Sequence, residues 1–176
     1  QLQGMENLQK YMEAAYESGY TKYCKKEENY EKIVYEYYSK YDGSETAGER
    51  LKNEMPWEYT IDGITYNLYD GPENIGYEPY IKAVCNYLDK NYEYTLSPGK
   101  LENGRDFLEQ FMERKKGYCT YFATIATEMF RIYGIPARYV EGYYVKPQAA
   151  DLIDYYKNNT ITVEVKDDNA HAWTEI

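Results

Sequence analysis

The chain lacks the features that several large classes of protein need. It contains one histidine, its formal net charge is −10, and its longest basic cluster is Arg114-Lys115-Lys116. Binding to nucleic acid requires a basic face that neutralises phosphates, so nucleic acid is not an expected partner, and an anionic membrane surface is disfavoured for the same reason. No apolar run approaches the roughly 20 residues that span a bilayer, so we do not expect this chain to insert into a membrane directly.

Cysteine is scarce as well. Cys24, Cys85 and Cys119 form no even disulfide framework, and with no CxxC pair and one histidine the sequence predicts neither a structural metal site nor a cofactor. Cys85 falls on the apolar stripe of an expected helix and should be a small buried side chain. Because the chain begins at Gln1 rather than Met, we expect it to be part of a longer protein whose targeting segments are not included.

Tyrosine is the residue that the chain has in excess, with 25 copies against four phenylalanines in 176 residues. This length suits one domain with a core of its own. The simplest interpretation is that tyrosines occupy core and rim positions, with the ring buried and the hydroxyl in water. The alternative is an aromatic surface that stacks on sugars or extended peptides.

Hydrophobic periodicity predicts helices first and strands afterwards. Apolar residues at three- and four-residue spacing indicate helices over residues 5–16, 26–40 and 119–133 and others that begin near 79 and 106, with a loop over 42–48. Asp62-Gly63 predicts a hairpin within 57–69, and alternation predicts strands over 138–145, 160–165 and 170–176. This order indicates an α+β fold, with an N-terminal helical region (1–56) followed by a core (57–176).

The stretch Gly117-Tyr118-Cys119 places a thiol at the start of an expected helix. The thiolate is the attacking form of cysteine, and the positive end of a helix favours it while the free N–H groups of the first turn can hold an oxyanion. His171 is the one imidazole available as a base, so this assignment has no competitor in the chain. The alternative interpretation is a buried cysteine and an unrelated surface histidine.

Three segments resemble the core of the transglutaminase-like superfamily, in particular its bacterial, often membrane-anchored members. They are Gly-Tyr-Cys-Thr-Tyr-Phe-Ala at 117–123, Gly-Ile-Pro-Ala-Arg-Tyr-Val-Glu-Gly-Tyr at 134–143 and Asn-Ala-His-Ala-Trp-Thr-Glu-Ile at 169–176. The resemblance extends over roughly residues 77–176. It implies a papain-like fold in which the helix that bears the cysteine packs on an antiparallel sheet that carries the histidine.

The resemblance also implies roles for individual residues. Cys119 would be the nucleophile and His171 the general base and then acid, while Trp173 would shield the site from water. Tyr94 is a candidate oxyanion donor, with a packed structural tyrosine as the alternative. Arg138 would form a buried or half-buried ion pair, and Gly142 would allow close packing within its strand.

The aspartate that completes the family's triad lies on the strand after the histidine strand, and the chain stops at Ile176 before such a strand. Glu175 lies four residues along from His171, roughly 13 Å away at the rise of a strand. Asp167 and Asp168 are expected to be exposed loop acids. We therefore expect the chain by itself to be weakly active or inactive, because loss of the analogous aspartate in a serine protease lowers turnover about 10⁴-fold.

The leading functional hypothesis is cysteine-dependent acyl transfer on amide or peptide bonds through a thioester, as a protease, amidase or transglutaminase. Its partner would be a peptide or protein substrate. The resemblance also implies a location outside the cytoplasm, with membrane anchoring in the full-length protein. One alternative is a non-catalytic module that binds peptide or glycan in a larger surface protein. Another is that residues 1–56 dock on a partner or cover the cleft.

Overall fold

The computed structural model describes residues 21–145 and 163–176, with side chains from residue 30 onward in the first range. The helix predicted over 5–16 lies outside these residues. The chain divides into two compact units, residues 1–37 and 38–176. The helix α2 (Thr21–Tyr38) is the described part of the first unit, and it overlaps most of the helix predicted over 26–40. The division predicted between residues 56 and 57 stays a prediction.

The second unit begins with a helix where a loop was predicted over 42–48. Helix α3 (Glu45–Glu54) starts directly after Ser44, whose hydroxyl accepts the N–H of Ala47 and caps the first turn. Ala47 and Leu51 are fully buried. Gly48 lies within this helix, and the ring of Tyr41 packs directly against it: an added Cβ would be 2.7 Å from that ring. Close packing therefore explains a glycine that by itself indicates a loop.

A hairpin and a helix follow, and both were predicted. Strands β1 (Glu58–Ile61) and β2 (Ile64–Asn67) pair antiparallel, and Asp62 and Gly63 both have positive φ, as a two-residue hairpin turn requires. After a short helix α4 (Pro72–Ile75), helix α5 (Glu78–Asn91) carries Pro79 in its first turn. Its buried face contains Tyr80, Ala83, Val84, Tyr87 and Leu88.

The chain then passes through a short strand and helix α6 and returns as a second strand that pairs with the first. Strand β3 (Glu93–Tyr94) pairs in parallel with β4 (Lys116–Gly117), so Tyr94 lies opposite Gly117. Between them, α6 (Phe107–Arg114) is capped by the Asp106 carboxylate, which accepts the N–H of Glu109 at 2.9 Å. This pairing brings residue 94 to the start of the central helix.

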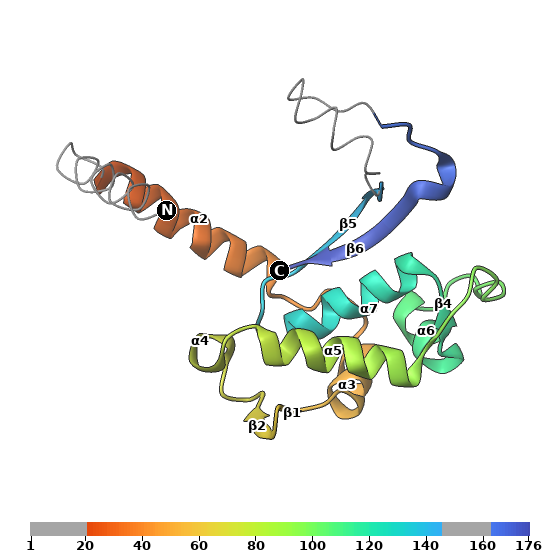
Figure 1. The fold of residues 1–176 in the computed structure, drawn as a ribbon, viewed down its shortest axis with the longest axis horizontal. Helices are drawn as coiled ribbons and strands as arrows, with labels where there is room; N and C mark the ends of the chain where they lie inside the picture. The colour runs from red at the N-terminus through yellow and green to blue at the C-terminus, as the bar shows by residue number, and fades with distance from the viewer. Residues whose placement is uncertain (1–20, 146–162) are drawn as a thin grey trace. The chain divides into compact units, whose positions relative to one another are not determined.

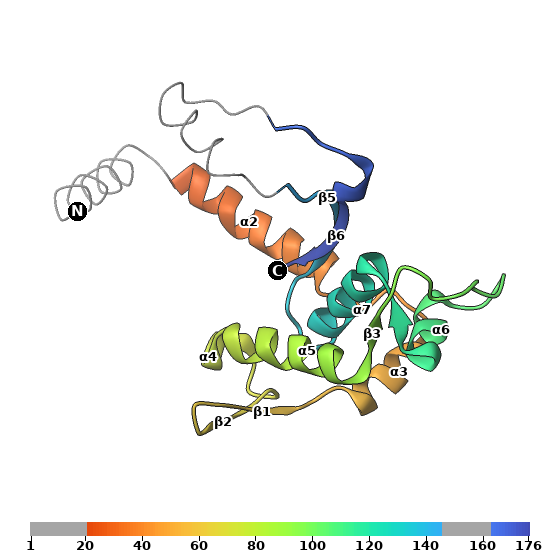
Figure 2. The same ribbon diagram turned by 45° about the vertical axis from the view of Figure 1, so that its right-hand side comes forward.

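Helix α7 (Cys119–Ile132) packs between α5 and the antiparallel pair of β5 (Arg138–Tyr143) and β6 (Ala170–Glu175) (Figures 1 and 2). The core around α7 includes Phe111, Ile125, Met129 and Ile135, each without exposed surface. The fold is therefore α+β, with the helix that bears Cys119 on an antiparallel sheet, as predicted. Residues 163–165 of the strand predicted over 160–165 have no regular structure, and 160–162 lie outside the described residues.

Candidate active site

Cys119 is the first residue of α7. Tyr118 precedes the helix in an extended conformation and contributes no side-chain cap, so the helix begins with free N–H groups. Gly117 is needed at this point because Tyr121, one turn into the helix, folds back over it: an added Cβ would lie 2.5 Å from the Tyr121 ring. The φ of Gly117 is not positive, so close packing and not a left-handed conformation is the reason for the glycine.

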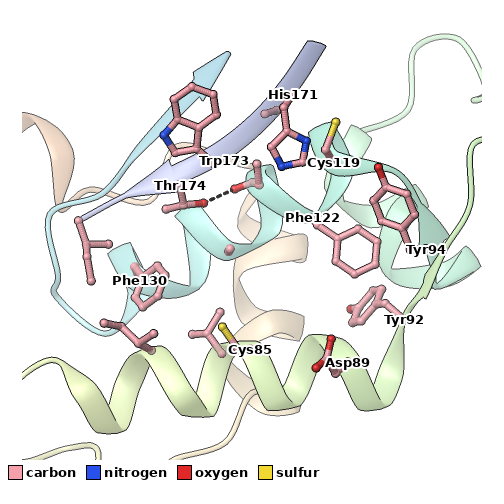
Figure 3. Close-up of a pocket in the computed structure, with 16 residues that line it drawn as sticks. Cys85, Asp89, Tyr92, Tyr94, Cys119, Phe122, Phe130, His171, Trp173 and Thr174 are labelled. Carbon is pink, nitrogen blue, oxygen red and sulfur yellow. Dashed lines mark hydrogen bonds between the residues drawn. The ribbon is translucent and has the colours of Figure 1, made fainter. Parts of the chain in front are cut away.

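His171 is fixed relative to α7 by the residues that follow it on β6. The Thr174 hydroxyl donates to the carbonyl oxygen of Ala123 at 2.9 Å and lies 3.1 Å from the Thr127 hydroxyl. These contacts join the middle of α7 to β6, and His171, three residues earlier, lies at the N-terminal end of the helix. Figure 3 shows its imidazole near the Cys119 thiol.

Two hollows meet at these two side chains. One, of about 610 Å³, and another, of about 750 Å³, share the lining residues Tyr94, Cys119, His171 and Ala172. We call the first the apolar hollow, because its other walls are mostly apolar side chains of α5, α7 and β6. We call the second the polar hollow, and its further lining includes Tyr118, Thr120, Glu141, Tyr143 and Asp168. The cysteine and the histidine thus face both hollows from their junction.

Trp173 and Tyr94 lie on two sides of the pair. Trp173 lines the apolar hollow and covers Gly142, where an added Cβ would lie 2.8 Å from the indole ring, so the close packing predicted for Gly142 is confirmed. Tyr94 is 57% exposed and packs on Phe122, with ring centroids 5.7 Å apart. Its hydroxyl reaches the site from β3 (Figure 3).

The acids near the C-terminus do not hydrogen-bond to His171. Glu175 accepts hydrogen bonds from Arg138 at 2.8 Å and from the Trp173 indole at 3.1 Å. Both bonds hold the pKa of Glu175 below its usual range, and the bond from Arg138 has the larger effect. Asp167 and Asp168 are exposed in a short 3-10 turn (Asp167–Asn169), as predicted. The His171 imidazole lies beside the Tyr144 ring, with 6.2 Å between the ring centroids.

A hydrogen-bonded pair of side chains near the cysteine was not predicted from the sequence. The hydroxyl of Tyr139 donates to the Glu141 carboxylate. The pKa of the Tyr139 hydroxyl is raised, mainly by burial and further by the hydrogen bond to Glu141. A hydrogen bond with Thr120 lowers this pKa in part. Glu141, the partner of this tyrosine, lines the polar hollow together with Cys119. The alternation of Tyr139, Glu141 and Tyr143 along β5 was the signal that could have revealed the group.

Two predictions about single residues were wrong. Cys85 is exposed and lines the apolar hollow instead of being buried, because its position on α5 faces the space between that helix and β6. Its sulfur is nevertheless partly buried, which raises the pKa of the Cys85 thiol, and the charge of Asp89 adds to this. Arg138 forms the predicted ion pair, with Glu175, but at an exposed strand end and not in a buried position.

The described part of the chain contains no group of three or more histidine, cysteine or acidic residues placed to hold a metal ion. None of the described helices is long and apolar enough to cross a membrane.

An α+β fold with a cysteine at the start of its central helix and a histidine on the adjoining antiparallel strand defines a papain-like protein of the cysteine–histidine type. The model of the transglutaminase-like superfamily matches residues 65–176, more than half of the chain, and the protein belongs to this family. Family membership generally implies cysteine-based acyl transfer or protease activity.

The chain is also similar to YebA, an uncharacterized protein of Bacillus subtilis strain 168. The two are 34% identical over 99 residues, which cover 54% of this chain and 13% of YebA. The chain therefore spans a small part of that relative's length. No solved structure matches the chain.

Proposed function

We propose that this protein catalyses acyl transfer from amide or peptide bonds through a thioester on Cys119, with His171 as base and then acid. The observation that carries the proposal is the position of the thiol at the N-terminus of α7, at a junction of two hollows that it shares with the imidazole. A helix N-terminus favours the thiolate and offers N–H groups to an oxyanion.

The proposed steps use these two residues, the N–H groups at the start of α7, and water or an amine as acceptor. His171 takes the thiol proton as the Cys119 sulfur attacks the carbonyl carbon, and a tetrahedral oxyanion forms near the N–H groups at the start of α7. The carbon–nitrogen bond then breaks, the imidazolium protonates the departing amine, and a thioester remains. Water or a second amine attacks the thioester, His171 takes the proton of that nucleophile, and the sulfur leaves as thiolate. Water gives hydrolysis, and an amine gives a new amide.

Two further residues have proposed roles in this chemistry. The Tyr94 hydroxyl would donate a hydrogen bond to the oxyanion, since it lines both hollows together with Cys119. Trp173 would limit the access of water to the thioester from the apolar hollow. The substrate would be a peptide or protein, and the site of action outside the cytoplasm, with membrane anchoring through other parts of a longer protein.

We expect slow turnover, because no carboxylate among the described residues hydrogen-bonds to His171 and fixes its tautomer. The same observation favours a second candidate function, a non-catalytic module that binds peptide or glycan in the tyrosine-lined hollows. The two candidates differ in whether a thioester forms.

A trapping experiment tests the proposal. The chain is incubated with glutamine-containing peptides or denatured casein, together with either hydroxylamine or a fluorescent primary amine. We expect hydroxamate or fluorescent product that depends on time, that persists in Cys85→Ala and that is lost in Cys119→Ala and His171→Ala. Product that does not depend on Cys119 would exclude the proposed mechanism, and binding of the peptides with no product in any variant would favour the binding module.

A further inference from the structure

The polar hollow has an unusual combination of lining groups. Glu141 and Asp168 supply two carboxylates from different elements, and Tyr94, Tyr118 and Tyr143 supply aromatic rings. No lysine or arginine of the described ranges lines this hollow. Lys166, which precedes the turn that carries Asp168, pairs with Glu164 instead, at 3.9 Å. Among the described residues, His171 is therefore the one basic side chain that lines the hollow beside the two carboxylates.

Glu141 is an exposed side chain of β5, and a hydrogen bond favours one orientation of its carboxylate. It lies on β5 opposite Ala172, the residue after His171, and it accepts a hydrogen bond from the Tyr139 hydroxyl. Burial and the nearby Glu141 raise the pKa of Tyr139, so this hydroxyl keeps its proton and remains a donor. The carboxylate of Glu141 thus lines the hollow that the cysteine–histidine pair also lines.

We propose that the polar hollow is a subsite for a positively charged side chain of a peptide substrate, with Glu141 and Asp168 as its specificity-determining residues. An ammonium or guanidinium group is attracted both by carboxylates and by the faces of aromatic rings, whereas an acidic side chain is repelled. The inference rests on the proposed function, because it assumes that a substrate's reactive carbonyl lies at Cys119.

Methanethiosulfonate reagents of different charge measure this preference without a known substrate. The thiolate of Cys119 attacks the sulfenyl sulfur, a disulfide forms, and methanesulfinate leaves. The aminoethyl reagent resembles a lysine side chain, the sulfonatoethyl reagent is anionic, and the methyl reagent is neutral. Rates are measured by mass spectrometry in a Cys24→Ser, Cys85→Ser background, and each is divided by the rate with N-acetylcysteinamide.

We expect the cationic reagent to exceed the anionic reagent at Cys119 by roughly tenfold, and this ratio to fall about threefold in Glu141→Gln and in Asp168→Asn. Gln retains the oxygen that accepts the Tyr139 hydrogen bond. Asp167→Asn is the matched control, since it removes one charge from the same turn without lining the hollow, and it should leave the ratio unchanged. Asp168→Asn tests the subsite independently, because it lies in an exposed turn outside the core.

The possible results separate this inference from the proposed function. A normalised ratio of cationic to anionic rates near one would overturn the cationic subsite, even if the neutral reagent reacts rapidly. An equal fall of this ratio in Asp167→Asn and Asp168→Asn would overturn it as well. Slow reaction of Cys119 with the neutral reagent, unaffected by His171→Ala, would instead contradict the proposed cysteine–histidine chemistry.

Discussion

Glu128 is expected to make the stability of the fold depend on pH in the opposite direction from an ordinary ion-paired carboxylate. Its side chain is 6% exposed on α7, and one guanidinium, that of Arg131, lies 2.9 Å from it and 3.0 Å from the carboxylate of Asp42. Two carboxylates share one cation, so burial outweighs Arg131 and raises the pKa of Glu128 to about 7, with the charge of Asp42 adding to the rise.

The sign follows from linkage. A carboxyl whose pKa is raised in the folded state stabilises the fold at pH values below its unfolded pKa, here 4.5, and this stabilisation is lost as the pH rises through about 7. Between pH 5 and pH 8 the loss amounts to about 2–3 kcal/mol, since each pKa unit corresponds to about 1.4 kcal/mol. Glu128→Gln removes the titrating group and with it this part of the pH dependence.

Urea unfolding at pH 5 and pH 8 measures the effect. The free energy of unfolding of Glu128→Gln, relative to the unchanged protein, should rise by about 2–3 kcal/mol from pH 5 to pH 8. Glu49→Gln, at an exposed position of α3, is the control and should show no such change. A relative stability of Glu128→Gln that is the same at both pH values would mean that Arg131 keeps Glu128 ionised, and the reasoning would be wrong.

Three further predictions concern the site and its support. Tyr94→Phe should lower acyl transfer by roughly tenfold to a hundredfold if its hydroxyl holds the oxyanion, and unchanged product formation would assign it a packing role only. Thr174→Val keeps the shape of the side chain but removes the hydrogen bond to the Ala123 carbonyl, so it should lower the free energy of unfolding by about 1 kcal/mol and slow the alkylation of Cys119. A loss of stability with no change in alkylation would show that this hydrogen bond does not position His171. Gly142→Ala should displace the Trp173 ring and cost about 1–3 kcal/mol, and an unchanged Trp173 fluorescence spectrum in a Trp57→Phe background would contradict the close contact.

Much of the fold around the site could be predicted because its signals are local. The helix from Cys119 has a continuous apolar stripe and ends before Gly134, and the Asp62-Gly63 turn has the chemistry of a two-residue hairpin. Helix α3 was missed since Gly48 opposes a helix, and the contact with Tyr41 that explains it is tertiary. Propensity carries no information about such a contact.

The candidate pair could be predicted for a similar reason: one histidine and one cysteine at a helix start leave few choices. The polar hollow could not, because it combines β3, β5, β6 and the turn before β6, which only the pairing of distant segments brings together. Cys85 was misplaced because helical periodicity indicates which face is apolar but not whether a neighbouring element covers it. Burial of one residue depends on that neighbour.

The most direct test of the central claim compares two thiols of the same molecule. Iodoacetamide is applied at pH 6.5 in a Cys24→Ser background, and modification of Cys119 and Cys85 is followed by mass spectrometry. Cys85 is an exposed residue whose sulfur is partly buried, and this partial burial raises the pKa of the thiol. It serves as the slow internal reference, and N-acetylcysteinamide in the same solution gives the rate of an ordinary thiol, which Cys119 should also exceed. We predict that Cys119 reacts at least about tenfold faster than Cys85 and that His171→Ala removes most of this difference. Equal rates for the two cysteines, or a Cys119 rate that does not change in His171→Ala, would contradict an activated cysteine–histidine pair.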